Sequence, residues 1–136
     1  DFIVAEEGVP VSVGAYEAQI AYYGSEIVLN YETEPPMGDF VYSARLPLLN
    51  REIPFWMYGR KLVFLDAYYV LIEKVENKTW NPIATVIIDI HRGKYVSLGN
   101  LYTDISVEDE VVLKNRFDGN SMTLKGVDEL NLINIE

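Results

Sequence analysis

The chain has 136 residues, 49% of them hydrophobic, which suffices for one domain with its own core. It contains no cysteine and one histidine, which excludes disulfides, thiolate metal sites and multi-histidine metal sites. The net charge of −10 disfavours nucleic acids and anionic membranes as partners, because binding to phosphates depends on clustered Lys and Arg. We therefore expect a single acidic β-rich domain over residues 1–136, without metal or cofactor.

The compartment and the oligomeric state are not fixed by the sequence. No apolar run is long enough to span a bilayer as a helix, and no basic and apolar leader opens the chain. The first residue is Asp1 rather than Met, so the removal of a leader or tag stays open. Many intracellular proteins are this acidic, which favours the cytoplasm without establishing it.

The first strands are expected in the N-terminal third. Residues 2–5 form a short apolar segment, which predicts a first strand or an ordered tail. Residues 9–23 alternate between apolar and polar, with a change of phase at Gly14 where a bulge is tolerated. This pattern favours a strand. The alternative is a helix over residues 15–23 that ends at Gly24, because Ala, Glu and Gln are good helix formers.

The next segments alternate between strands and turns. Gly24 and Ser25 predict a tight turn into a strand over residues 26–33, which makes a hairpin. Residues 34–39 contain two prolines and predict a loop, because proline supplies no N–H group to a sheet. Residues 40–46 predict another strand, and residues 48–53, between two prolines, predict an irregular segment or an edge strand.

The most apolar part of the chain lies between residues 59 and 98 and predicts the centre of the sheet. Residues 62–75 are too long and too apolar for one strand, so we expect a turn or bulge at Asp66 and Ala67. Residues 77–82 predict a loop, and residues 83–90 predict a buried strand. The turn at residues 91–94 leads into another strand.

The C-terminal segments close the predicted fold. Residues 107–116 are undecided, because a capping box at residues 106–109 favours a helix whereas alternating Val and Leu favour a strand. Residues 118–120 predict a hairpin turn, and residues 130–135 predict a last strand. We expect a mainly β fold: a single-domain antiparallel sheet, as a sandwich or a partly open barrel. At most one or two short helices are expected, over residues 15–23 and 107–116.

The uneven charge indicates where a partner binds. Residues 1–44 contain eight acidic residues and no Lys or Arg. A surface that combines carboxylates with Tyr is suited to the Lys and Arg of a basic protein. A Trp in a loop is a further candidate contact, because it has no obvious core to enter. The candidate partner-binding residues are Glu17, Tyr22, Tyr23, Glu32, Glu34 and Trp80.

These features favour a protein-binding module that binds and neutralises a basic protein partner, as an inhibitor or immunity protein does. The alternative is a β barrel or sandwich that binds a small ligand or a carbohydrate, which fits the ten Tyr, five Phe and two Trp. An enzyme fits least, because one histidine and no cysteine leave few activated groups.

Two weaker hypotheses concern chemistry. Asp89 and His91 would share a face of one strand as a carboxylate and imidazole pair, although an exposed turn histidine fits the surrounding residues better. The acidic segments 32–34, 108–110 and 118–120 offer oxygen ligands for calcium, but none has the spacing of a known binding loop. The sequence therefore predicts no catalytic or metal-binding residue.

Overall fold

The computed structural model describes residues 1–127 and 130–135, and these are 49% strand and 1% helix. The mainly β fold is thereby confirmed, as two sheets without a closed barrel among the described residues. The strands are β1 (Phe2–Val4), β2 (Glu17–Tyr22), β3 (Ser25–Thr33), β4 (Val41–Leu46), β5 (Arg51–Glu52), β6 (Met57–Tyr58), β7 (Val63–Phe64), β8 (Tyr69–Val75), β9 (Pro82–Asp89), β10 (Lys94–Ser97), β11 (Asp104–Val107), β12 (Val111–Lys114), β13 (Ser121–Leu124) and β14 (Ile133–Asn134).

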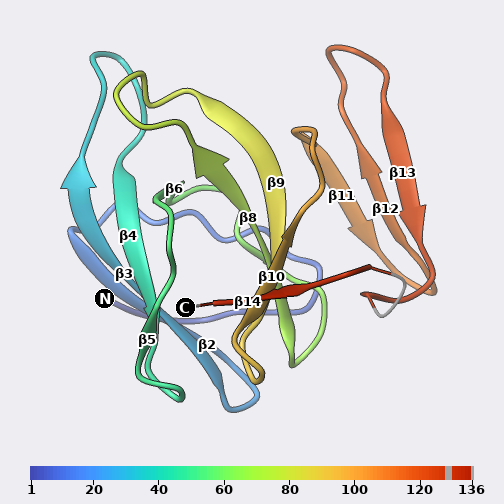
Figure 1. Cartoon of the computed structure of the whole chain (residues 1–136), viewed down its shortest axis with the longest axis horizontal. Coiled ribbons are helices and arrows are strands. Elements are labelled where there is room, and N and C mark those ends of the chain that lie inside the picture. Colours follow the sequence, from blue (N-terminus) through green and yellow to red (C-terminus); the bar gives the residue numbers. More distant parts are fainter. Residues whose placement is uncertain (128–129, 136) are drawn as a thin grey trace.

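The larger sheet has the order β1-β2-β3-β4-β6-β8-β9-β10-β14, with β5 beside β4 and β7 beside β8. Its pairs are antiparallel except for β1 and β2, which run parallel. Only short strands join its halves, since β6 pairs with β8 at one position, Met57 with Lys74. The sheet therefore folds over, and the inner faces of both halves enclose one core. Figure 1 shows β2, β3 and β4 on one side and β8, β9 and β10 facing them.

Strands β8 and β9 are buried on both faces. Ile72 and Ile88 point into the core between the two halves of the larger sheet. Leu71 and Ile87, on the opposite face, pack against the smaller sheet β11-β12-β13. Burial on both sides explains the nearly continuous apolar sequence of these strands. The result is three layers of strands, which Figure 1 shows side by side.

Residues 107–116 do not form a helix: they contain the end of β11, a turn and β12. Ile105 pairs with Leu113 and Val107 with Val111, and their side chains pack toward the middle layer. Helix capping offers about 1 kcal/mol, whereas a strand here buries a row of Val, Ile and Leu against an apolar face that otherwise stays exposed. Tertiary packing therefore overrides the capping signal.

Residues 15–23 do not form a helix either, because β2 occupies residues 17–22 and pairs with β3. The two-residue turn of this hairpin consists of Tyr23 and Gly24, with φ values of 43° and 82°. Positive φ at both positions is typical of the turn that matches the twist of a hairpin. The turn therefore lies one residue earlier than the sequence indicated, and Ser25 is already a buried residue of β3.

A buried carboxylate on β8 depends on an arginine outside the strand. Glu73 is 2% exposed, and its Oε2 accepts a hydrogen bond of 2.7 Å from Nε of Arg60. Nη1 of Arg60 lies 2.5 Å from Oδ2 of Asp39, which is 56% exposed. Arg60 thus joins the middle layer to the loop between β3 and β4.

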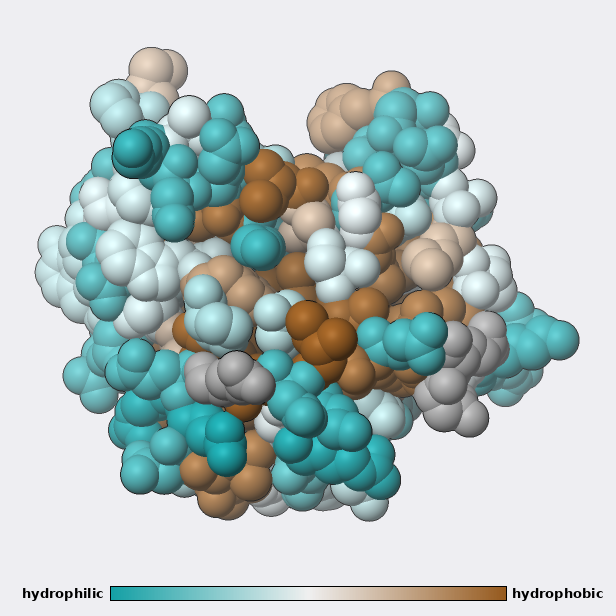
Figure 2. Space-filling view, in the orientation of Figure 1, coloured by the Kyte–Doolittle hydropathy of each residue, from teal (hydrophilic) through white to brown (hydrophobic). Residues whose placement is uncertain are grey.

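The side of the molecule in Figure 2 has hydrophobic residues across its middle, in front of β9, β10 and β14, with hydrophilic residues around them. Strand β14 contributes Ile133, which is 57% exposed. This side offers little to a basic partner. Among the described residues, no helix has the length and apolar character needed to cross a membrane.

The Arg60 ion pairs give a test of the fold. Arg60→Ala should lower the free energy of unfolding by about 3 kcal/mol, because it leaves the buried Glu73 carboxylate without its partner. Asp39→Ala removes only the exposed pair and should cost about 0–1 kcal/mol. Chemical denaturation measures both changes. Equal costs for the two variants would contradict the assignment of Glu73 as the buried member.

Candidate protein-binding surface

The outer face of strands β2, β3 and β4 is polar and acidic. Inward-pointing residues of these strands lie in the core, so their neighbours along each strand point to solvent. We call the polar residues of this surface the acidic sheet face: Glu17, Gln19, Glu26, Asn30, Glu32, Ser43 and Arg45. Val28 and Val41 lie on the same side of their strands but are buried. The acidic sheet face holds three carboxylates and one guanidinium, and Arg45 lies opposite Glu52 of β5. The acidic sheet face therefore keeps a negative charge.

The strand register fixes how these side chains are arranged. Glu17 lies opposite Asn30, and Asn30 lies opposite Ser43. The Ser43 hydroxyl donates a 2.6 Å hydrogen bond to Oε2 of Glu32, and Nε2 of Gln19 donates a 2.9 Å bond to Oε2 of Glu26. These bonds hold two of the three carboxylates in place. Two of the sequence-predicted residues, Glu17 and Glu32, thus share one face, and both are exposed.

A group of aromatic side chains lies at the end of the hairpin where β2 begins, and two of its members, Tyr31 and Phe40, pack against the core on the inner side of the sheet. Tyr16 stacks on Phe40 with 5.7 Å between ring centroids. Both rings make T-shaped contacts with Tyr31, with centroid distances of 4.9 Å from Tyr16 and 4.8 Å from Phe40. Tyr16 is 69% exposed. We call Tyr16, Tyr31 and Phe40 the aromatic rim. The sequence analysis missed it as a site because its three members come from three segments.

Glu34 is tied to the aromatic rim. The Tyr31 hydroxyl donates a 3.0 Å hydrogen bond to Oε1 of Glu34. Burial raises the pKa of Tyr31, and the Glu34 carboxylate raises it further by accepting the phenol proton and by repelling a phenolate. The phenol therefore stays neutral at physiological pH. Glu34 lies in the loop beyond β3, so the structure brings Glu17, Glu32 and Glu34 to the same end of the molecule.

Tyr22 and Tyr23 lie at the other end of the hairpin. Glu17 and Tyr22 are the first and last of the six residues of β2, which puts them about 17 Å apart at the usual rise of a strand. Tyr22 packs against Phe64 and Tyr23, and Tyr23 is 84% exposed. Burial raises the pKa of Tyr22, with a smaller contribution from the charge of Glu7. These two tyrosines do not join the acidic sheet face.

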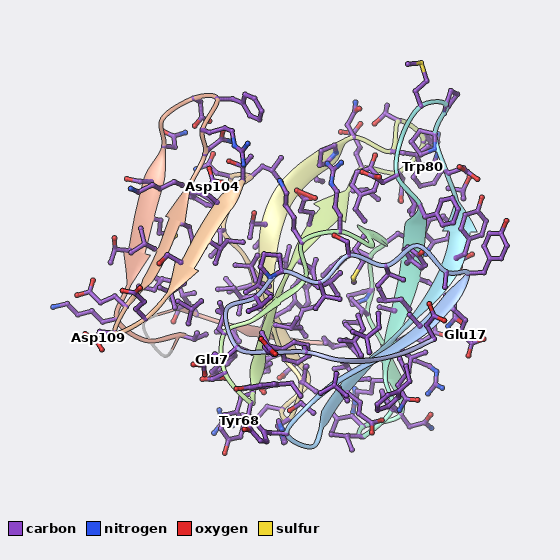
Figure 3. All side chains as sticks on the ribbon, turned by 180° about the vertical axis from the view of Figure 1, so that it is seen from behind. Glu7, Glu17, Tyr68, Trp80, Asp104 and Asp109 are labelled. Carbon is purple, nitrogen blue, oxygen red and sulfur yellow. The ribbon has the colours of Figure 1, made fainter. Side chains whose placement is uncertain are left out.

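Trp80 is not a free loop side chain. Its ring stacks on Trp56 with centroids 5.4 Å apart and planes 14° from parallel. Its carbonyl oxygen accepts a hydrogen bond from the Tyr58 hydroxyl, and Tyr58 lies opposite Val41 of β4. Figure 3 shows Trp80 and Glu17 well apart on the same side of the molecule. Trp80 therefore lies beside the acidic sheet face, packed near Val41 on the outer side of β4, and not among its carboxylates.

Asp89 and His91 do not form a carboxylate and imidazole pair. Oδ1 of Asp89 accepts bonds from the backbone N–H groups of His91 and Arg92, at 3.0 and 2.9 Å, so this buried carboxylate holds the turn after β9. Nε2 of the imidazole instead lies 2.7 Å from the hydroxyl oxygen of Ser25. That hydroxyl donates a hydrogen bond to the carbonyl of Ala67. The weaker hypothesis for this pair is wrong.

The contact between Ser25 and His91 ties three turns together. Ser25 is fully buried and its hydroxyl donates to the carbonyl of Ala67, and Nε2 of His91 lies 2.7 Å from this hydroxyl and 3.2 Å from the same carbonyl oxygen. Tyr68 covers the imidazole edge at 4.8 Å between centroids. The arrangement fixes the β2–β3, β7–β8 and β9–β10 turns and places no nucleophile at the surface. Residues 66 positions apart give no sequence signal for such a contact.

The three acidic segments considered for calcium lie apart in the fold, at the end of β3, in the β11–β12 turn and in the β12–β13 turn. Within residues 1–127 and 130–135, no three His, Asp or Glu side chains come together as a metal ion requires. In the third segment, Oδ1 and Oδ2 of Asp118 accept hydrogen bonds from Asn120, which stabilise the turn.

The comparisons with known proteins add no family. No family model, curated protein or solved structure matches the chain. The geometry of the described residues therefore carries the functional argument.

The bond between Tyr31 and Glu34 predicts a pH effect. In the folded protein Tyr31 should ionise above its ordinary value of 10.0, so its contribution to stability is complete below pH 10 and is lost as the pH rises through the raised pKa. Glu34→Gln should lower the pKa of Tyr31, because the charged acceptor is removed. NMR titration of the Tyr31 ring carbon measures this shift.

Glu32→Gln is the matched control, because it removes the same charge from a residue that does not accept the Tyr31 proton. An equal fall in the pKa of Tyr31 in both variants would show that general charge, and not the hydrogen bond, sets its value.

Proposed function

We propose that this chain is a protein-binding module that holds a basic protein partner on the acidic sheet face and neutralises it, in the manner of an inhibitor or immunity protein. The observation that supports this proposal most is the register of β2, β3 and β4. It gathers Glu17, Glu26 and Glu32 on one face whose seven residues include one basic side chain, Arg45, itself opposite Glu52. The ammonium group of Asp1 lies beside this face, where it donates a 3.0 Å hydrogen bond to the carbonyl oxygen of Glu17.

The acidic sheet face and the aromatic rim would act differently in binding. Exposed carboxylates raise the association rate with a positively charged partner over about 8–10 Å, the screening length at physiological salt. They add little to affinity individually, because water screens each pair. The aromatic rim supplies short-range contact area, and the exposed Tyr16 ring is suited to a Lys or Arg of the partner.

Three bonds keep the site in one arrangement before binding. Glu26, Glu32 and Glu34 each accept a hydrogen bond from a neighbouring side chain. A site whose side chains are already ordered loses less entropy when a partner binds. This favours a specific partner over general attraction to basic proteins.

Charge reversal tests the proposal. The triple variant Glu17→Lys, Glu32→Lys and Glu34→Lys should lower the capture of the basic partner from host-cell extract by at least about 10-fold. Quantitative mass spectrometry of the captured proteins measures this loss. The association rate of the captured partner should also fall as salt is raised from about 0.05 to 0.5 M.

The control reverses the same number of charges on the smaller sheet, with Glu108→Lys, Asp109→Lys and Glu110→Lys. These three exposed residues lie in the β11–β12 turn, away from the acidic sheet face. The control variant should capture the partner as the unchanged protein does. Identical capture by both triple variants, or a captured partner without net positive charge, would refute the proposal.

A further inference from the structure

A second surface adjoins the acidic sheet face: a groove between the β5–β6 segment and the β8–β9 turn, whose lining includes Glu52, the residue opposite Arg45. It has a volume of about 890 Å³, near the upper end of the range of about 300–1,000 Å³ that is usual for ligand sites. Trp56 and Trp80 both line it, and they are the only two tryptophans of the chain. We call it the Trp groove.

The aromatic part of the Trp groove is held rigidly. The stacked rings of Trp56 and Trp80 pack against the buried side chains of Val41, Tyr58 and Val75. The Tyr58 hydroxyl donates a hydrogen bond to the backbone carbonyl of Trp80 and so fixes the position of that residue. Both indole rings are half-buried, so part of each remains accessible. A rigid, partly exposed indole is a good platform for a flat apolar face of a ligand, because little entropy is lost on contact.

The turn that carries Trp80 is held in an unfavourable backbone conformation. Lys78 and Trp80 have φ values of 77° and 60°, in the left-handed region that glycine adopts without strain. Each such residue costs about 1 kcal/mol, and such strain is found at binding sites. Two backbone bonds close the turn: Glu76 N–H donates to Asn81 at 2.8 Å, and Trp80 N–H donates to Glu76 at 2.9 Å. The turn therefore holds Trp80 in place although its backbone conformation is strained at Lys78 and Trp80.

The polar lining of the Trp groove is electrically balanced, unlike the rest of this acidic protein. Glu52 and Glu76 carry two negative charges, and Lys74 and Lys78 carry two positive charges. The carboxylates accept hydrogen bonds, the ammonium groups donate them, and the Asn77 amide does both. A ligand rich in hydroxyl groups satisfies such a lining, since each hydroxyl both donates and accepts.

From these observations we propose that the Trp groove binds a neutral oligosaccharide, with an apolar sugar face against the indole of Trp80 or Trp56 and its hydroxyls on the charged lining. Zero net charge in the groove argues against an anionic or cationic saccharide. A proline-rich peptide fits less well, because its carbonyl groups only accept hydrogen bonds and so make no direct bond to Glu52 or Glu76, which keep their water. This proposal is independent of the basic partner.

Intrinsic fluorescence gives a direct test, because both tryptophans of the chain lie in the groove and every change in indole emission reports on it. The probes are cellohexaose, xylohexaose, mannohexaose and chitohexaose, with an oligogalacturonate and a decaproline peptide for comparison. At least one of the four neutral hexasaccharides should give a saturable change in emission that persists at about 0.5 M salt, where long-range charge effects are screened.

The variants separate stacking from folding. Trp80→Ala should weaken hexasaccharide binding at least 10-fold, with Trp56 as the remaining reporter. Asn77→Ala changes only an exposed lining residue and should weaken binding measurably without altering the fold. Tyr23→Ala removes an exposed aromatic ring at the distant hairpin turn and should leave affinity unchanged.

Three results would overturn the proposal: no change in emission with any neutral hexasaccharide, tighter binding of the oligogalacturonate or of decaproline than of every neutral probe, or equal loss of affinity in Trp80→Ala and Tyr23→Ala.

Discussion

Burial of β8 and β9 on both faces is the constraint on which the other layers depend. Ile72 and Ile88 require one apolar layer, and Leu71 and Ile87 require a second layer on the opposite side. A single curled sheet satisfies only the first requirement, so the smaller sheet is needed for the second. One polar group within this middle layer is also satisfied: the buried Thr85 hydroxyl accepts a 2.9 Å bond from the backbone of Tyr102.

The two proposed binding surfaces use different parts of this framework and different physical effects. The acidic sheet face is the outer side of the first layer, where charge acts at long range and is weakened by salt. The Trp groove lies where the end of β8 meets the β5–β6 segment, and its stacking and hydrogen bonding act at contact. The two surfaces adjoin where Arg45 lies opposite Glu52, so variants away from this boundary, at Glu17 or Trp80, and the salt dependence distinguish their contributions.

Much of the fold follows from local pattern, but the site depends on register. Alternation within residues 9–23 and the apolar runs at 62–75 and 83–90 predict strands, and the structure has β2 at 17–22, β8 at 69–75 and β9 at 82–89. The capping signal left residues 107–116 undecided between helix and strand, because packing against the middle layer, which decides for a strand, is a tertiary effect. The sequence pattern placed Tyr22 and Glu17 in one binding surface. The two residues stand at opposite ends of β2, and the length of the strand separates them by about 17 Å. The stacking of Trp80 on Trp56 joins distant segments and has no local signal.

Native-state hydrogen exchange tests the central claim that the middle layer holds the structure together. The backbone amides of β8 and β9 should exchange only through global unfolding, with opening free energies equal to the free energy of unfolding from denaturation. The amides of β11, β12 and β13 should open at lower free energy, because the outer face of their sheet is solvated. If β8 and β9 instead open more readily than the β2–β3 hairpin, the middle layer does not carry the fold and this account of the structure is wrong.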